Sequence, residues 1–216
     1  KKALEDFKFS MEDFAKQIEQ TLALLESIKN EQAVQKALQI SEEIEKMQKS
    51  INDRTQESSS DNAKLAEDQA QASQRYENLE QELKKLQEML KKDPQASRQL
   101  QELMNDMQQS KAKEDMQQSQ QSLTQNQRSQ AMQAQQSAME KMRRFTLKLG
   151  EMKQSMSSGS QGETMQALET AIREILIFSK KHEQTKARYQ NDPYPLVPEL
   201  IAAYEGMQIS LNKLFS

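Results

Sequence analysis

The sequence predicts an all-α fold, an elongated antiparallel helical bundle or coiled coil of about five long helices. Apolar residues recur at steps of three and four along most of the 216 residues, which is the spacing of one helix face. Gly and Pro, the residues that interrupt helices, occur only four times each. Hydrophobic residues make up 35% of the chain and mean hydropathy is -0.97, which favours an elongated shape over a compact globule.

Disorder is the alternative, because low hydrophobicity and polar tracts are typical of disordered chains as well. Two observations weigh against it. The helical spacing of apolar residues runs through most of the chain, and Pro is absent before Pro94. We therefore expect a folded helical protein.

The first helix is expected over residues 3–56. Its apolar seam has good heptad a and d residues and changes phase between Ile28 and Ala33. We expect one continuous helix with a phase shift, because neither Gly nor Pro lies there, and a short turn at Asn30 is the alternative. The seam after the shift consists of Ala33, Ala37, Ile40, Ile44, Met47 and Ile51.

The second and third helices are expected over 61–92 and 94–156, after boundaries near 57–62 and 92–95. The first boundary gathers Ser, Asp and Asn side chains that can cap a helix, and Asp93-Pro94 forms the second, where Asp93 can cap the helix that Pro94 opens. The third helix contains a tract from Gln101 to Glu140 in which thirteen residues are Gln. Its residues are good helix formers without Pro or Gly, so we expect an unbroken helix with a weak apolar seam.

Two more helices are expected over 163–190 and 198–215. A Ser/Gly-rich loop near 157–163 precedes the first, and a Pro-rich segment near 191–198 separates the two. We expect a single helical domain over 1–216. The chain begins without Met and stops inside a patterned helix, so we expect it to be a piece of a longer protein.

The composition gives no support for catalysis. Cys is absent, which excludes a thiol nucleophile or thiolate metal site, and His182 has no second His with which to share a metal ion. Phosphate-binding and nucleophile motifs are missing. A net charge of -3 gives no electrostatic reason to expect a nucleic-acid partner. The sequence has no run of about 18 apolar residues, which is the length that a membrane-spanning helix needs. We expect no catalytic, cofactor or metal residues.

The most consistent function is therefore a non-catalytic scaffold or protein–protein interaction module, which binds a protein partner or another copy through its helix faces. The alternative is an amphipathic bundle that carries a lipid or another apolar ligand. Met is abundant between Met104 and Met165, where core filling is a better explanation than an adaptable binding surface. The candidate packing and interaction seam consists of Phe7, Met11, Phe14, Ile18, Leu79, Leu83, Leu86, Met142, Phe145, Leu149, Leu168, Ile172, Ile175 and Tyr204.

Three segments resemble a known family. Residues 171–185 read Ala-Ile-Arg-Glu-Ile-Leu-Ile-Phe-Ser-Lys-Lys-His-Glu-Gln-Thr. They resemble a helix near the end of an uncharacterised bacterial family, domain of unknown function 4175, with His182-Glu183 in place of the usual Gln-Glu. Leu79 to Leu90 with the Gln/Met-rich tract, and Met139 to Met152 with the following loop, are similar to its helical region.

The resemblance covers most of the chain and implies a location. The parent would be a large bacterial envelope protein with amino-terminal membrane helices, and this piece would lie on the periplasmic side of the inner membrane. A cytoplasmic location is the alternative. The family has no established reaction, so the resemblance implies no catalytic residues.

Overall fold

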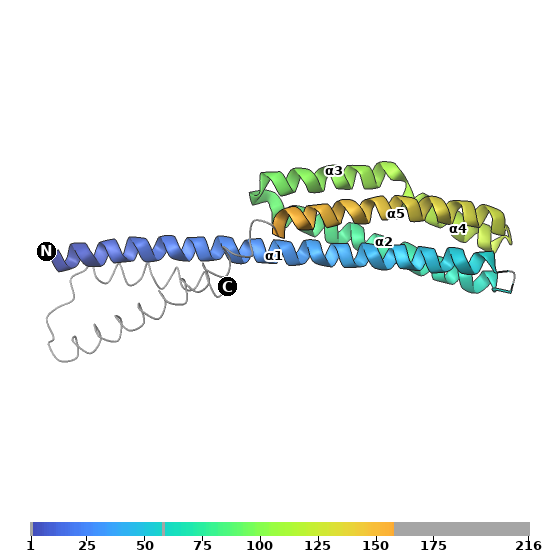
Figure 1. The fold of residues 1–216 in the computed structure, drawn as a ribbon, viewed down its shortest axis with the longest axis horizontal. Helices are drawn as coiled ribbons and strands as arrows, with labels where there is room; N and C mark the ends of the chain where they lie inside the picture. The colour runs from blue at the N-terminus through green and yellow to red at the C-terminus, as the bar shows by residue number, and fades with distance from the viewer. Residues whose placement is uncertain (1, 58, 158–216) are drawn as a thin grey trace, which may run out of the picture. The chain divides into compact units, whose positions relative to one another are not determined.

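The computed structural model describes residues 2–57 and 59–157. This part of the chain is all-α, as the sequence predicts, and contains no strand. Its elements are α1 (Lys2–Gln56), α2 (Asn62–Met89), the short 3-10 helix η1 (Leu90–Lys92), α3 (Pro94–Ser110), α4 (Ala112–Thr124) and α5 (Arg128–Ser157) (Figure 1). The helices expected over 163–190 and 198–215, with the boundary near 191–198, lie outside the described residues.

Residues Lys29–Ser158 form a compact unit. Of the other unit, which combines Lys1–Ile28 with Gly159–Ser216, the structure describes the helix up to Ile28. The single domain expected over 1–216 stays a prediction. Helix α1 is unbroken at Asn30, which confirms the expected continuity.

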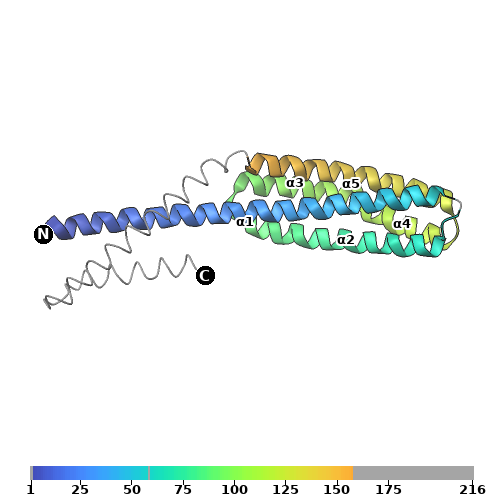
Figure 2. The ribbon, with the colours of Figure 1, turned by 60° about the horizontal axis from the view of Figure 1, so that its bottom comes forward.

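Within Lys29–Ser158, the helices pack as a bundle. Helix α2 returns antiparallel to α1, the α3–α4 pair runs back along α2, and α5 returns along α3–α4 and α1, on the opposite side of the bundle from α2 (Figure 2). One hydrophobic cluster takes residues from every helix, including Val34, Tyr76, Leu100, Met116 and Leu149. A smaller cluster lies near the α1–α2 and α4–α5 turns and contains Ile51, Leu65, Ala66, Ala72, Leu123 and Ala131.

Two of the predicted helix caps are confirmed. The Asp61 carboxylate accepts a hydrogen bond from the Ala63 amide at 2.9 Å and begins α2. The Asp93 carboxylate accepts from the amides of Gln95 and Ala96 at 3.1 and 3.0 Å, and Pro94 is the first residue of α3. Short polar side chains satisfy first-turn amides that have no partner within the helix, while Pro lacks the amide altogether.

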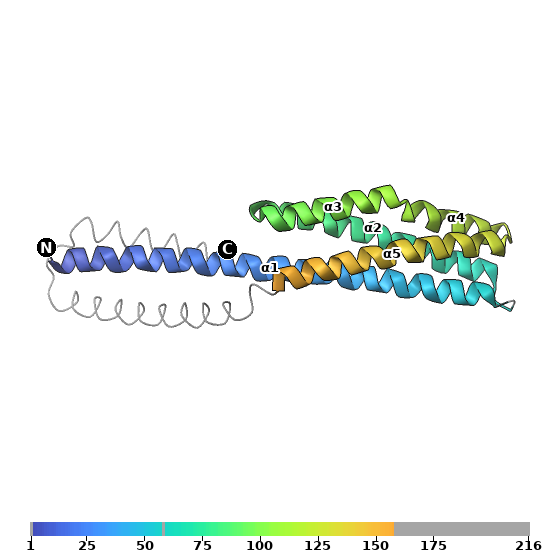
Figure 3. The ribbon, with the colours of Figure 1, turned by 45° about the horizontal axis from the view of Figure 1, so that its top comes forward.

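The prediction of one helix over 94–156 is wrong at two places. The first is Lys111, whose backbone is left-handed at φ 57° and ψ 31°. Figure 3 shows the break between α3 and α4. The buried seam steps from Met107 directly to Ala112, five positions instead of three or four. A regular helix would turn Ala112 away from the core, and one left-handed residue restores its direction. We call this break the elbow.

The second break is the turn Gln125–Gln127, which ends α4 and reverses the chain into α5. The Gln127 amide donates to the Ser122 carbonyl at 2.7 Å, and the Asn126 amide donates to the Leu123 carbonyl at 3.0 Å. This pair of bonds is the Schellman motif that closes many helices. Asn126 has φ 60°, so it takes the left-handed position that is usually occupied by Gly.

Arg128 connects the α1–α2 turn to the α4–α5 turn at one end of the bundle. Its guanidinium donates to the Glu57 carbonyl at 2.6 Å, to the Ser60 carbonyl, and to the Asn62 side-chain oxygen at 2.7 Å. The side-chain amide of Asn62 in turn donates to the side-chain oxygen of Asn126 at 2.8 Å. The α1–α2 turn and the start of α5 are therefore joined by charge-assisted hydrogen bonds.

We predict that Lys111→Gly raises the free energy of unfolding by about 0.5–1 kcal/mol, because Gly adopts a left-handed backbone without the steric cost that other residues bear. Gln117→Gly, at an exposed position inside α4, is the control and should lose about 1 kcal/mol. Chemical denaturation of the two variants measures both changes. Equal losses would contradict the left-handed elbow.

We predict that Arg128→Ala lowers the free energy of unfolding by about 1.5 kcal/mol, since hydrogen bonds to charged groups contribute about 1.5–3 kcal/mol. Arg143→Ala is the matched control, because Arg143 is exposed on the same helix without a hydrogen bond or ion pair to the described residues. It should stay within about 0.5 kcal/mol of the original chain in thermal or chemical unfolding. A loss as large in Arg143→Ala would show that the contacts of Arg128 are not the cause.

Candidate functional site

Six of the predicted seam residues lie inside the bundle of Lys29–Ser158. Leu79, Leu83 and Leu86 of α2 and Met142, Phe145 and Leu149 of α5 are all buried in one cluster, with Phe145 the most exposed of them at 6%. Ile18 is buried as well. Phe7, Met11 and Phe14 belong to α1, but their side chains lie outside the described part, as do Leu168, Ile172, Ile175, Tyr204 and His182. An interaction role for this seam stays a prediction.

In the Gln-rich tract, most Gln side chains lie on the surface, and smaller or more flexible side chains lie in the core. Eleven of its thirteen Gln side chains are exposed, and Gln135 is the one that is fully buried. The buried positions belong to small or flexible residues such as Ala112, Met116, Ser119 and Ala138. Met107, Met142 and Met152 are buried too, which agrees with Met as a core filler in this region.

A layer of buried polar side chains, which sequence reasoning missed, crosses the bundle near the two turns. The Ser119 hydroxyl donates to the Gln69 side-chain oxygen at 3.1 Å, linking α4 to α2. The Gln135 amide donates to the Thr55 hydroxyl at 3.2 Å, linking α5 to α1. The members of this polar layer are Gln48, Asn52, Thr55, Gln69, Ser119, Ser122 and Gln135.

Several amide atoms of the polar layer have no hydrogen-bond partner. Both polar atoms of the Gln48 side chain are enclosed and unpaired, as are the side-chain oxygens of Asn52 and Gln135 and the side-chain nitrogen of Gln69. A buried polar group without a partner costs about 1–3 kcal/mol, so this end of the core is less stable than a leucine core of similar size. The burial of Gln48 could have been predicted from the sequence, because Gln48 follows Ile44 by four positions and precedes Ile51 by three, which is the spacing of the apolar seam.

The elbow forms one wall of a pocket that sequence reasoning also missed. The pocket has a volume of about 360 Å³ and lies among α2, α3, α4 and α5. We call it the elbow pocket. Its lining residues are Tyr76, Asp106, Met107, Gln109, Ser110, Ala112, Lys141, Met142, Arg144, Phe145 and Lys148.

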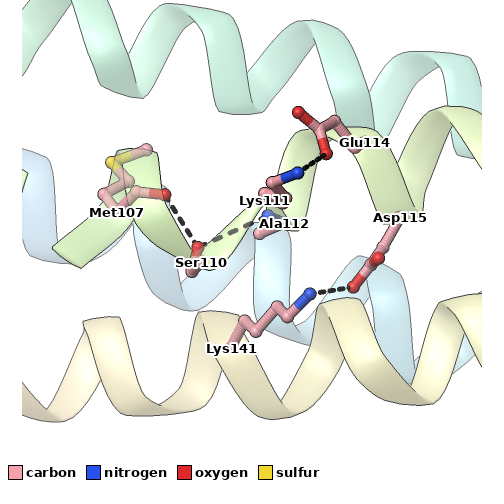
Figure 4. A network of polar contacts seen from close by, with 7 residues as sticks. All are labelled: Met107, Ser110, Lys111, Ala112, Glu114, Asp115 and Lys141. Carbon is pink, nitrogen blue, oxygen red and sulfur yellow. Dashed lines mark hydrogen bonds and ion pairs between the residues drawn. The ribbon is translucent and has the colours of Figure 1, made fainter. Parts of the chain in front are cut away.

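Polar groups surround the opening at the elbow. The Ser110 hydroxyl donates to the Met107 carbonyl at 2.7 Å, and Lys141 reaches from α5 to the Asp115 carboxylate on α4 at 2.6 Å (Figure 4). Farther along α5, Lys148 pairs with Asp106 of α3. These two ion pairs therefore connect α5 to α4 and to α3, the helices on either side of the elbow.

Three side chains among the described residues of the bundle have pKa values that differ from their ordinary ones. Burial, with a smaller contribution from Glu80, raises the pKa of the Tyr76 phenol well above its ordinary value, so Tyr76 is neutral at physiological pH. Hydrogen bonds from Lys36 and Lys85 lower the pKa of Glu82. A hydrogen bond with Glu77 raises the pKa of Lys113. Glu82 and Lys113 thus belong to ion pairs that join α2 to α1 and to α4.

The described residues contain no group of His, Cys, Asp and Glu side chains arranged to hold a metal ion. Among the same residues, no helix has the length and apolar character needed to cross a membrane. No family model, curated protein or solved structure matches the chain.

We predict that Gln48→Leu raises the free energy of unfolding by about 1–2 kcal/mol, because it replaces an enclosed amide without partners by an apolar side chain of similar size. Gln69→Leu is the control. It removes the acceptor of the buried Ser119 hydroxyl, so it should bring no comparable gain. Chemical denaturation compares the two, and a clear loss of stability in Gln48→Leu would show that the amide has a partner in solution.

Proposed function

We propose that this chain is a non-catalytic helical scaffold or protein–protein interaction module. The observation that carries the proposal is the exposure of the Gln side chains on α3 and α4, while the apolar seam beneath them is used within the bundle. A partner would therefore meet a surface of neutral amides rather than a free apolar stripe. We call this surface the Gln face. Its residues are Gln101, Gln108, Gln109, Gln117, Gln118 and Gln121.

The chemistry of the Gln face supports contact with protein. Each Gln amide carries two donor hydrogens and an acceptor oxygen, so it can pair with backbone or side-chain groups of either polarity. The Gln side chains of the face are uncharged, and the whole chain has a net charge of -3, which gives little attraction for nucleic acid. A partner protein or a second copy of this chain fits such a surface.

The cellular setting of the proposal depends on the family resemblance. A helical module on the periplasmic side of the inner membrane, attached to a membrane-anchored bacterial envelope protein, would suit a role in connecting partners. A cytoplasmic location is the alternative setting. A lipid or apolar-ligand carrier is the alternative function, and the closed packing of α1, α2, α3–α4 and α5 against one another favours the scaffold.

The proposal predicts that the Gln face lies against a partner in the native cell. A photo-crosslinking amino acid placed at Gln117, on the exposed side of α4, should give a discrete protein adduct under native expression. The same probe at Gln74, exposed on α2, is the control and should give little adduct. Mass spectrometry identifies the partner or a second copy. Equal labelling at both positions, or none at either, would contradict the proposal.

A further inference from the structure

The elbow pocket has the size and the apolar base of a small-ligand site. Its volume of about 360 Å³ falls within the roughly 300–1,000 Å³ that small-molecule pockets occupy. Met107, Met142 and Phe145 contribute its apolar base, and each of them is at most 6% exposed. Methionine sulfur and an aromatic ring both make favourable contacts with another aromatic ring, so this base is suited to an aromatic ligand.

Tyr76 supplies a polar group inside this apolar setting. The residue is 2% exposed and lines the pocket from α2. Its hydroxyl has no hydrogen-bond partner among the described residues. The hydroxyl is not one of the enclosed side-chain atoms without a partner, so it keeps contact with solvent, and Tyr76 lines the pocket. A polar substituent on a bound ligand would provide that missing partner.

The rim of the pocket carries one positive charge that the bundle does not neutralise. Lys141 and Lys148 each pair with an aspartate, Asp115 and Asp106 respectively. Arg144 lies between the two lysines on α5, lines the pocket and has no ion pair with the described residues. A guanidinium binds a carboxylate through two parallel hydrogen bonds, so a ligand with a single carboxylate matches this rim.

We propose that the elbow pocket binds a small aromatic carboxylate that carries a hydrogen-bonding group on its ring. The carboxylate pairs with Arg144, the ring packs on Met107, Met142 and Phe145, and the ring substituent hydrogen-bonds to the Tyr76 hydroxyl. This site goes beyond the proposed scaffold function and does not depend on it. Gln109 belongs both to the Gln face and to the pocket lining, but the residues that would contact the ligand, Arg144, Tyr76 and the apolar base, lie outside the Gln face.

Calorimetric titration of the full chain with three probes tests the assignment. The probes are para-hydroxyphenylpropionate, phenylpropionate and the neutral amide of phenylpropionate. We expect the hydroxylated acid to bind most tightly, and phenylpropionate to bind about tenfold more tightly than its amide, because only the acid forms charge-assisted hydrogen bonds. Equal affinity of phenylpropionate and its amide would overturn the proposal, as would the absence of saturable binding.

Three variants assign the contacts. Arg144→Gln should weaken both acids about tenfold, whereas Arg143→Gln, at an exposed neighbouring position outside the pocket, should leave them unchanged. Tyr76→Phe should abolish the advantage of the hydroxylated acid, a loss of about three- to tenfold, without lowering the melting temperature of the free chain. Equal losses in the two arginine variants, or an undiminished hydroxyl advantage in Tyr76→Phe, would overturn the proposal.

Discussion

The heptad seam of α5 is the constraint to which the other helices conform. A series of buried residues follows steps of four and three from Ala131 to Met152, with Ala134 as an additional buried residue. The buried positions of α2 keep the same spacing from Leu65 to Leu86, with Ala66 as an additional one. Knobs-into-holes packing requires this spacing from every partner helix. The α3–α4 segment meets it in two separate stretches, so one residue between them must leave the helix. Lys111 is that residue, and the elbow follows from the register of its neighbours.

The polar layer follows from the same registers. Ser41, Gln48 and Thr55 alternate with Ile44 and Ile51 at seam spacing, so α1 cannot bury its isoleucines without burying these polar groups. The Gln69–Ser119 and Gln135–Thr55 bonds each join two helices. A shift of one helix by a heptad would break them and leave more amides unpaired. The layer thus costs stability and favours one alignment of the helices.

Features that depend on local chemistry could be predicted from the sequence. The caps at Asp61 and Asp93, the position of Pro94 and the continuity of α1 at Asn30 depend on a few neighbouring residues, and the structure confirms each of them. The elbow, the Asn126 cap and the buried Gln48 could not be found by searching for helix breakers and apolar residues. Lys and Asn can adopt a left-handed backbone when packing on both sides demands it, and a polar seam residue is recognised only after the heptad is extended through it.

The elbow also explains why the pocket was beyond prediction. Its base includes Met142 and Phe145, two residues of the predicted seam, but the space above them exists because α3 and α4 do not continue as one helix. On one side of the elbow, leucines such as Leu83, Leu90 and Leu100 fill the core. On the other side, toward the α1–α2 and α4–α5 turns, the helices are joined by the polar layer and the contacts of Arg128. The break lies between these two kinds of packing, where neither leucines nor paired amides close the interior. Burial of an uncharged phenol is therefore tolerated at Tyr76, and its hydroxyl remains available to a ligand.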